Sequence, residues 1–172
     1  MHEMSDASLT APALLDEQHD LMPFSCGEAE LDDWLKRRAR ANQSSGASRT
    51  YVLAAQGRVI AYYALAGGAV IAREAPGRVR RNMPDPIPVI VLGRLAVDRA
   101  WQGQGLGTAM LRDAVLRTLQ AAEIIGVRAL LVHALYDDAA AFYRRAGFMP
   151  SPLRPHTLML PLRDVRAILA DT

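Results

Sequence analysis

Residues 89–107 read VIVLGRLAVDRAWQGQGLG. The first nine of them are almost uniformly apolar, which is typical of a central β-strand, and this strand is expected to end at Asp98. A glycine-rich turn follows and leads into an amphipathic stretch from about 105 to 124, which predicts a helix that Gly126 stops. A strand, a glycine-rich turn and a helix in this order are typical of an anion-binding site, because the first N–H groups of a helix lack partners within it and its dipole favours negative charge.

The spacing of the glycines separates the nucleotide-binding families that use this arrangement. A P-loop is excluded because the sequence contains no Gly-Lys-Ser or Gly-Lys-Thr, and the dinucleotide-binding pattern fails because Thr108 stands where its third glycine is required. Gln102, Gly105 and Gly107 instead resemble the Gln-x-x-Gly-x-Gly signature with which acetyltransferases of the GNAT superfamily bind a pyrophosphate. A turn that serves only the strand-to-helix geometry remains an alternative at this point.

A second motif, some forty residues further on, supports this resemblance. It lies after a predicted strand, on a helix expected from Asp137 or Asp138 to Arg145, where GNAT proteins carry their second coenzyme-contacting region. The residues of this motif are Ala139, Phe142, Tyr143, Gly147 and Phe148. GNAT proteins often have Asn where this chain has Tyr136, so the hydrogen bond that such an Asn donates does not transfer to this sequence.

The remaining elements predict a mixed sheet. A first helix is expected near 27–42, and Gln56-Gly57 predicts the turn of an antiparallel hairpin. Residues 73–88 hold four prolines and predict a surface loop, with Pro84 to Pro88 outside any sheet. The other expected elements are hairpin strands at 49–55 and 58–66, strands at 128–135 and 156–161, and a terminal helical turn at 165–169. Together they predict an α/β (mixed α+β) fold with a central mixed twisted sheet and helices on both faces. The resemblance implies that this is the GNAT acyltransferase fold, as a single domain over residues 1–172 in which residues 1–12 are expected to be flexible.

Composition bounds the class of protein. The chain has 172 residues, of which 51% are hydrophobic, and this is typical of one globular domain rather than a disordered polar tail. No apolar run approaches the roughly 20 residues that span a bilayer, and the first residues lack a signal-peptide pattern. The single Cys26 suits a reducing compartment. A cytoplasmic location is therefore expected. The four histidines and Cys26 show no metal-ligand spacing, so no metal is expected.

Charge is distributed unevenly along the chain. Residues 1–33 carry nine acidic and no basic residues, whereas residues 34–81 carry ten basic residues and one acidic residue. Nineteen of the 20 basic residues are arginine, whose planar guanidinium pairs with two phosphate oxygens at once, so an anionic partner is expected. Two alternatives stay open. Acids that begin and bases that end one helix across 28–40 suit the helix dipole without a ligand, and an arginine-rich composition also follows from a GC-rich genome.

Over roughly residues 16–162, the sequence resembles the GNAT toxins of bacterial type II toxin–antitoxin modules, of the TacT and AtaT type. The segments that carry this resemblance are Leu31-x-x-Trp34-Leu35, Ala41-Asn42-Gln43, 48–52, 61–65, 81–88 and 92–98. The resemblance implies an acetyl-CoA-dependent N-acetyltransferase that acetylates the free α-amino group of aminoacyl-tRNA and stops translation. It also implies a homodimer and a cognate antitoxin with a ribbon-helix-helix DNA-binding domain.

The resemblance further assigns roles to residues. Backbone N–H groups of Leu95, Ala96 and Val97 are expected to hold the acetyl carbonyl, and preorganised donors of this kind lower a barrier by about 3–4 kcal/mol. Tyr143 is expected to be the general acid for the departing thiolate, with a purely packing tyrosine as the alternative and Tyr136 as a group that assists or interferes. The other expected coenzyme contacts are Gln102, Gly103, Gln104, Gly105, Leu106, Gly107, Thr108 and Phe142. The expected tRNA contacts are Arg78, Arg80, Arg81, Lys36 and Arg37.

The sequence offers no strong base for the amine. The only carboxylate near the central strand is Asp98, and His133 is expected to be a hydrogen-bonded core residue. The lack of a base favours an α-amine, whose pKa of about 7.7–8.0 leaves part of it neutral at cellular pH, over a lysine amine with a pKa near 10.4. Acetylation of a small amine and a non-catalytic coenzyme- or partner-binding domain remain alternatives. Which aminoacyl group is accepted stays open.

Overall fold

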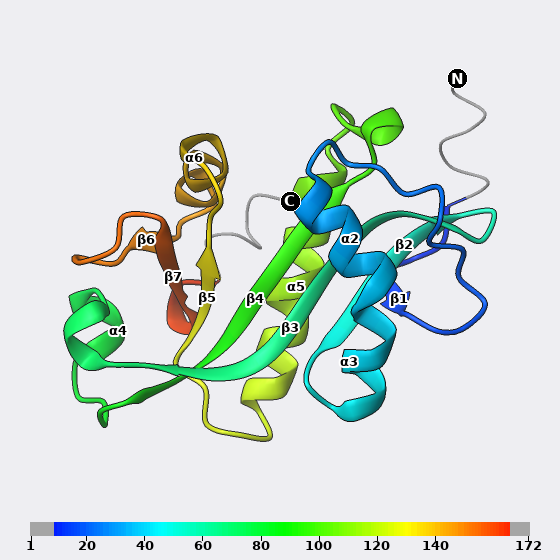
Figure 1. Cartoon of the computed structure of the whole chain (residues 1–172). Helices are drawn as coiled ribbons and strands as arrows, with labels where there is room; N and C mark the ends of the chain where they lie inside the picture. The colour runs from blue at the N-terminus through cyan, green and yellow to red at the C-terminus, as the bar shows by residue number, and fades with distance from the viewer. Residues whose placement is uncertain (1–8, 166–172) are drawn as a thin grey trace. The chain divides into compact units, whose positions relative to one another are not determined.

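Seven strands form one mixed sheet, in the order β1-β2-β3-β4-β5-β7-β6 (Figure 1). The computed structural model describes residues 9–165 of the chain. All pairs with a described register are antiparallel except β4 with β5, which run parallel. The strands are β1 (Ala13–Leu14), β2 (Arg49–Ala55), β3 (Arg58–Val70), β4 (Ile87–Val97), β5 (Ala129–His133), β6 (Met149–Pro150) and β7 (Thr157–Pro161). The predicted mixed sheet is therefore confirmed, while the two-residue strands β1 and β6 were not predicted.

The chain divides into two compact units, each built from two segments. Residues 1–66 and 94–113 form the first unit, and residues 67–93 and 114–172 form the second. Strands β3 and β4 and the long helix α5 (Leu106–Ala122) contribute residues to both units. A single domain over 1–172 stays a prediction. The expected flexible segment 1–12 falls mostly outside the described residues, and so does most of the expected helical turn at 165–169.

The first unit contains the predicted hairpin, whose turn residue Gln56 adopts a left-handed conformation with φ of 52°. The expected helix at 27–42 is wrong as one element, because the chain breaks at Arg38 into α2 (Ala29–Arg37) and α3 (Ala39–Ser45) and changes direction between them (Figure 1). The side-chain amide of Gln43 explains where α3 lies, since it donates to the carbonyl of Leu15 at 2.6 Å and accepts from the amide of Thr50 at 2.8 Å.

The second unit corrects the prediction of a surface loop at 73–88. A short helix, α4 (Gly77–Arg80), places Val79 in a fully buried position within an apolar cluster that also contains Ile87 and Met159. Strand β4 begins at Ile87, so Pro88 does lie in the sheet. Proline is tolerated at this position for two reasons. Its carbonyl still accepts a hydrogen bond, from the amide of Arg128 at 2.9 Å, and it is the second residue of the strand, where a missing N–H donor interrupts the sheet least.

The predicted helix after β5 is present as α6 (Asp137–Arg145). It buries Ala140 and Tyr143, and its acidic first turn and basic last turn suit the helix dipole. Gly147, with φ of 103°, follows the helix in the left-handed conformation that glycine adopts most readily. The helix thus carries the second predicted coenzyme motif on an ordered element of the second unit.

Candidate active site

Asp98 ends strand β4 and organises the start of the glycine turn. Its carboxylate accepts hydrogen bonds from the amides of Ala100 at 2.9 Å and Ser25 at 3.0 Å. A carboxylate that holds two backbone amides is a structural anchor, so Asp98 does not supply the base that the sequence lacks.

Gln102 ties the turn to two other backbone segments. Its side-chain amide donates to the carbonyls of Val97 and Cys26, both at 2.9 Å. The amide of Arg99 adds a bond of 2.8 Å to the carbonyl of Ser25. The glutamine of the signature therefore makes its hydrogen bonds to backbone carbonyls in this structure. It joins the turn to the end of strand β4 at Val97. Nearby, burial raises the pKa of the Cys26 thiol to about 11, which keeps the thiol protonated.

The glycines of the turn have the conformations that an anion site requires. Gly103 and Gly105 have φ of 80° and 84°, and a Cβ built on either would meet no atom within 4 Å. Residues 102–105 are exposed, whereas Trp101 beneath them is buried. Helix α5 begins at Leu106, directly after these glycines. Its first N–H groups, which lack partners within the helix, therefore lie next to a position where no side chain stands in the way. This fits a phosphate-type anion, whose oxygens approach backbone amides closely where no side chain intervenes.

Tyr143 lies in an aromatic cluster of the second unit. Its ring contacts the rings of Phe142 and Phe148 at centroid distances of 5.1 and 5.3 Å, both in edge-to-face geometry. Only 6% of the residue is exposed, and burial raises the pKa of the phenol well above its usual value of about 10. The phenol is therefore protonated throughout the physiological range and able to donate.

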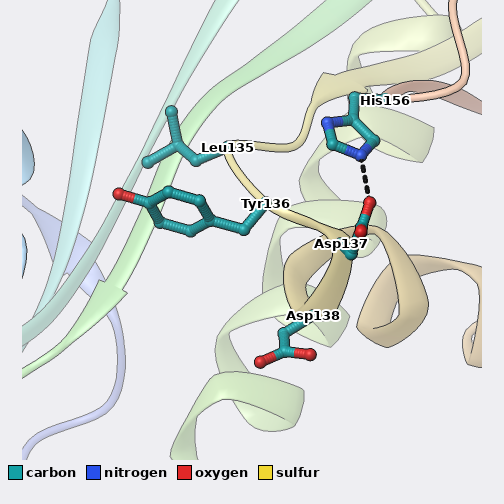
Figure 2. Close-up of a pocket in the computed structure, with 5 residues that line it drawn as sticks. All are labelled: Leu135, Tyr136, Asp137, Asp138 and His156. Carbon is teal, nitrogen blue, oxygen red and sulfur yellow. Dashed lines mark hydrogen bonds and ion pairs between the residues drawn. The ribbon is translucent and has the colours of Figure 1, made fainter.

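A pocket of about 390 Å³ opens where β5 meets α6. It is lined by Leu135, Tyr136, Asp137, Asp138 and His156, as Figure 2 shows. The ring of His156 joins the carboxylate of Asp137 through Nε2 and Oδ1 at 2.6 Å, whereas the Asp138 carboxylate lies away from this pair (Figure 2). Leu135 and Tyr136 are unusually exposed for their size. No sequence pattern indicated the His156–Asp137 pair, because the two residues are 19 positions apart.

His133 is hydrogen-bonded as expected, through Nδ1 to the hydroxyl of Thr157 at 3.0 Å. The expectation that it is a core residue is wrong, because its side chain is exposed at the end of β5.

The arginines expected to contact tRNA differ in how they are held. All three of Arg78, Arg80 and Arg81 are exposed, but Arg78 is paired with Asp164, at 3.1 Å from Nε and 2.5 Å from Nη2. Arg80 donates through Nη1 to the carbonyl of Ala75 at 3.3 Å. Arg128 donates to the backbone carbonyls of this segment, which fixes its shape. In α2, Lys36 and Arg37 occupy the last turn opposite an acidic first turn, which is the arrangement that the helix dipole favours without a ligand.

Residues 46–150 match the acetyltransferase (GNAT) domain family. This chain belongs to that family. It is 54% identical to a tRNA-acetylating toxin of Mycobacterium tuberculosis over 162 residues, which cover 94% of this chain and 98% of the toxin. The structure resembles that of AtaT complexed with acetyl-methionyl-tRNAfMet, with a TM-score of 0.86, 30% identity, and coverage of 94% of this chain and 99% of that one.

A second structure of AtaT contains two other ligands. An AtaT variant with one tyrosine replaced by phenylalanine has been solved with the C-terminus of the antitoxin AtaR and acetyl-CoA. It has a TM-score of 0.79 and 28% identity, covering 94% of this chain and 98% of that one. GNAT membership and the predicted fold class are thereby confirmed.

Within residues 9–165 no group of three or more His, Cys, Asp or Glu side chains is placed to hold a metal, and no helix is long and apolar enough to cross a membrane.

Proposed function

We propose that this protein is an acetyl-CoA-dependent N-acetyltransferase toxin that acetylates the α-amino group of aminoacyl-tRNA and so inhibits translation. The observation that carries this proposal is the 54% identity to a tRNA-acetylating toxin across nearly the whole length of both chains. Relatives of similar structure bind acetyl-methionyl-tRNA and acetyl-CoA, which supports the same acceptor and donor here.

The first unit supplies the groups for the donor. Acetyl-CoA brings an acetyl thioester, and the open N–H groups from Gln102 to Thr108 bind its pyrophosphate. Backbone N–H groups of Leu95, Ala96 and Val97 hold the acetyl carbonyl and stabilise the negative charge that develops on its oxygen. The bond of Gln102 to the carbonyl of Val97 supports this assignment, because it couples the position of the turn to that of Val97.

Tyr143 is the general acid, with Phe142 beside it as a coenzyme contact. The hydroxyl gives its proton to the thiolate as the bond between sulfur and the acetyl carbon breaks. Burial among aromatic rings keeps this phenol protonated, which an acid requires. The incoming α-amine needs no strong base, since a useful fraction of it is neutral at cellular pH.

The proposal includes partners for the protein. Exposed Arg80 and Arg81, together with Arg78, Lys36 and Arg37, contact tRNA phosphates. A cognate antitoxin of ribbon-helix-helix type binds the protein, as an antitoxin C-terminus binds AtaT. The protein acts as a homodimer in the cytoplasm.

Incubation with labelled acetyl-CoA and bulk charged tRNA tests the function, with deacylated tRNA as control. We expect label in charged tRNA only, recovered as N-acetyl amino acid after mild alkaline hydrolysis of the ester. Label in deacylated tRNA, or in neither RNA, would contradict the proposal.

A second candidate, acetylation of a small cationic amine, is favoured by the two carboxylates of the pocket at Asp137 and Asp138. A polyamine added to the same assay separates the two. Label entering the polyamine while charged tRNA remains unlabelled would establish the second candidate.

A further inference from the structure

Arg94 on strand β4 holds a positive charge that no carboxylate neutralises. Its guanidinium carbon lies 4.6 Å from the ring centroid of Trp34. The Nε atom is buried and has no hydrogen-bond partner. In the part of the chain that the structure describes, no carboxylate comes within ion-pair distance of this guanidinium. A buried donor without a partner costs about 1–3 kcal/mol, and the cation–π contact returns only about 0.5–2 kcal/mol, so the contact with Trp34 does not by itself explain the arrangement.

The guanidinium is held rigidly in this state. Trp34 stacks in turn on Tyr62, with centroids 6.0 Å apart and planes inclined by 10°. The hydroxyl of Tyr62 donates to the carbonyl of Leu31 at 2.7 Å, which fixes the ring at the base of the stack. A cation already immobilised on an aromatic face loses little conformational freedom when it binds a ligand.

The acids nearest to this stack do not take the role of partner. Glu30 and Asp32 lie on the same helix as Trp34, and both act electrostatically on the Tyr62 hydroxyl. Asp32 already accepts a hydrogen bond of 2.9 Å from the amide of Cys26. The half-buried guanidinium of Arg94 thus has no acidic partner among the described residues and is left for a group that arrives from outside the chain.

Arg94 immediately precedes Leu95 in the strand assigned above to the acetyl group. We infer that Arg94 is a binding site for a phosphate of the acceptor, namely the phosphodiester next to the aminoacylated ribose at the 3′ end of tRNA. This inference rests on the proposed function. A guanidinium suits this ligand because its planar fork matches two phosphate oxygens, and an aminoacyl ester lies one nucleoside away from the nearest phosphodiester. The phosphates of the coenzyme are the other groups of this chemical class that could bind the guanidinium of Arg94.

Two acceptors that differ by one phosphate test the inference. The first is a 3′-aminoacyl adenosine, which has no phosphate, and the second is an aminoacyl dinucleotide with one phosphodiester. Both carry an aminoacyl group that the wild type accepts on tRNA. We expect Arg94→Gln to lower kcat/KM for the dinucleotide about 10- to 100-fold, to leave kcat/KM for the nucleoside unchanged, and to leave the Kd of acetyl-CoA unchanged. Arg58→Gln, a change of an exposed arginine in the same unit, is the matched control and should alter none of these.

Arg94→Lys guards against a folding effect, since it keeps the charge and loses the planar fork. It should show a smaller loss that is again confined to the dinucleotide. Equal losses on both acceptors, or no loss on either, would overturn the inference while the proposed function stands. A weaker Kd for acetyl-CoA would assign Arg94 to a coenzyme phosphate and overturn it as well. A wild-type protein that acetylates neither acceptor nor charged tRNA would overturn the proposed function, and the inference with it.

Discussion

The side-chain amide of Gln102 donates a hydrogen bond of 2.9 Å to the backbone carbonyl of Val97. Val97 ends the strand assigned to the acetyl carbonyl, and Gln102 begins the turn assigned to the pyrophosphate. A second bond of equal length joins Gln102 to Cys26. One side chain therefore aligns the two segments of the first unit that are proposed to bind the coenzyme.

Replacing Gln102 by Ala should weaken acetyl-CoA binding about 5- to 150-fold, because the two lost hydrogen bonds each contribute about 0.5–1.5 kcal/mol to holding the turn. Isothermal titration calorimetry measures the effect. Gln120→Ala, at an exposed position of α5, serves as control and should bind normally. An unchanged affinity in the Gln102 variant would show that the turn keeps its shape without this side chain.

Gly105→Glu should abolish acetyl-CoA binding. The new carboxylate would occupy the open space in which the pyrophosphate is bound, and its charge would repel the ligand. Gly57→Glu is a close control, because Gly57 has φ of 82° and equally open surroundings in the hairpin turn. Both variants should lose about 1–2 kcal/mol of stability from the positive φ, but only the first should lose binding. Normal calorimetric affinity in a folded Gly105 variant would remove the turn from the site.

Tyr143→Phe should lower turnover roughly 100-fold or more while the Kd of acetyl-CoA barely changes, since only the hydroxyl is lost and the ring packing is kept. Cells should also tolerate overexpression of this variant when they do not tolerate the parent. Tyr51→Phe, another tyrosine in an aromatic pair, should keep normal turnover. Full turnover in the Tyr143 variant would exclude it as the acid and direct attention to Tyr136.

Neutralising substitutions in the arginine segment, residues 78–81, should have unequal effects on tRNA binding. Neutralising Arg80 and Arg81 should weaken binding of charged tRNA and reduce the slope of log K against log salt by about two, whereas Arg78→Gln should reduce that slope by less than one, because the guanidinium of Arg78 is already paired with Asp164. Fluorescence anisotropy across a salt series measures both slopes. If tRNA binding survives the double change while antitoxin binding weakens, the segment is an antitoxin site.

Alkaline pH should destabilise the fold through its buried tyrosines. Burial raises the pKa of Tyr143 and Tyr62 above the usual value of about 10. The unfolded chain therefore loses these protons at a lower pH than the folded chain does, so their contribution is complete below pH 10 and decreases as the pH rises above it. Urea unfolding at pH 8 and pH 11 measures the loss. Tyr143→Phe should show a smaller loss, and an identical one would contradict this assignment.

Several elements were predictable because their signals are local. The apolar run before Asp98, the glycine turn, the helix at 105–124 and the hairpin at Gln56-Gly57 all depend on periodicity and on glycine conformation, which neighbouring residues determine. The break at Arg38 and the entry of Pro88 into the sheet were not predictable. Each depends on a distant partner, such as the backbone at Leu15 or the amide of Arg128.

By itself, the sequence determined the family and the order of the two coenzyme motifs, because both motifs are defined by residue types at fixed spacings along the chain. Only the tertiary structure decided which side chains are free to act. It bound Asp98 to two amides, paired Arg78 with Asp164, brought His156 to Asp137, and placed Arg94 on Trp34 with no carboxylate of residues 9–165 within ion-pair distance. The physical reason is that hydrogen bonds and ion pairs act over a few ångströms in space, and residues up to 86 positions apart meet at that distance here.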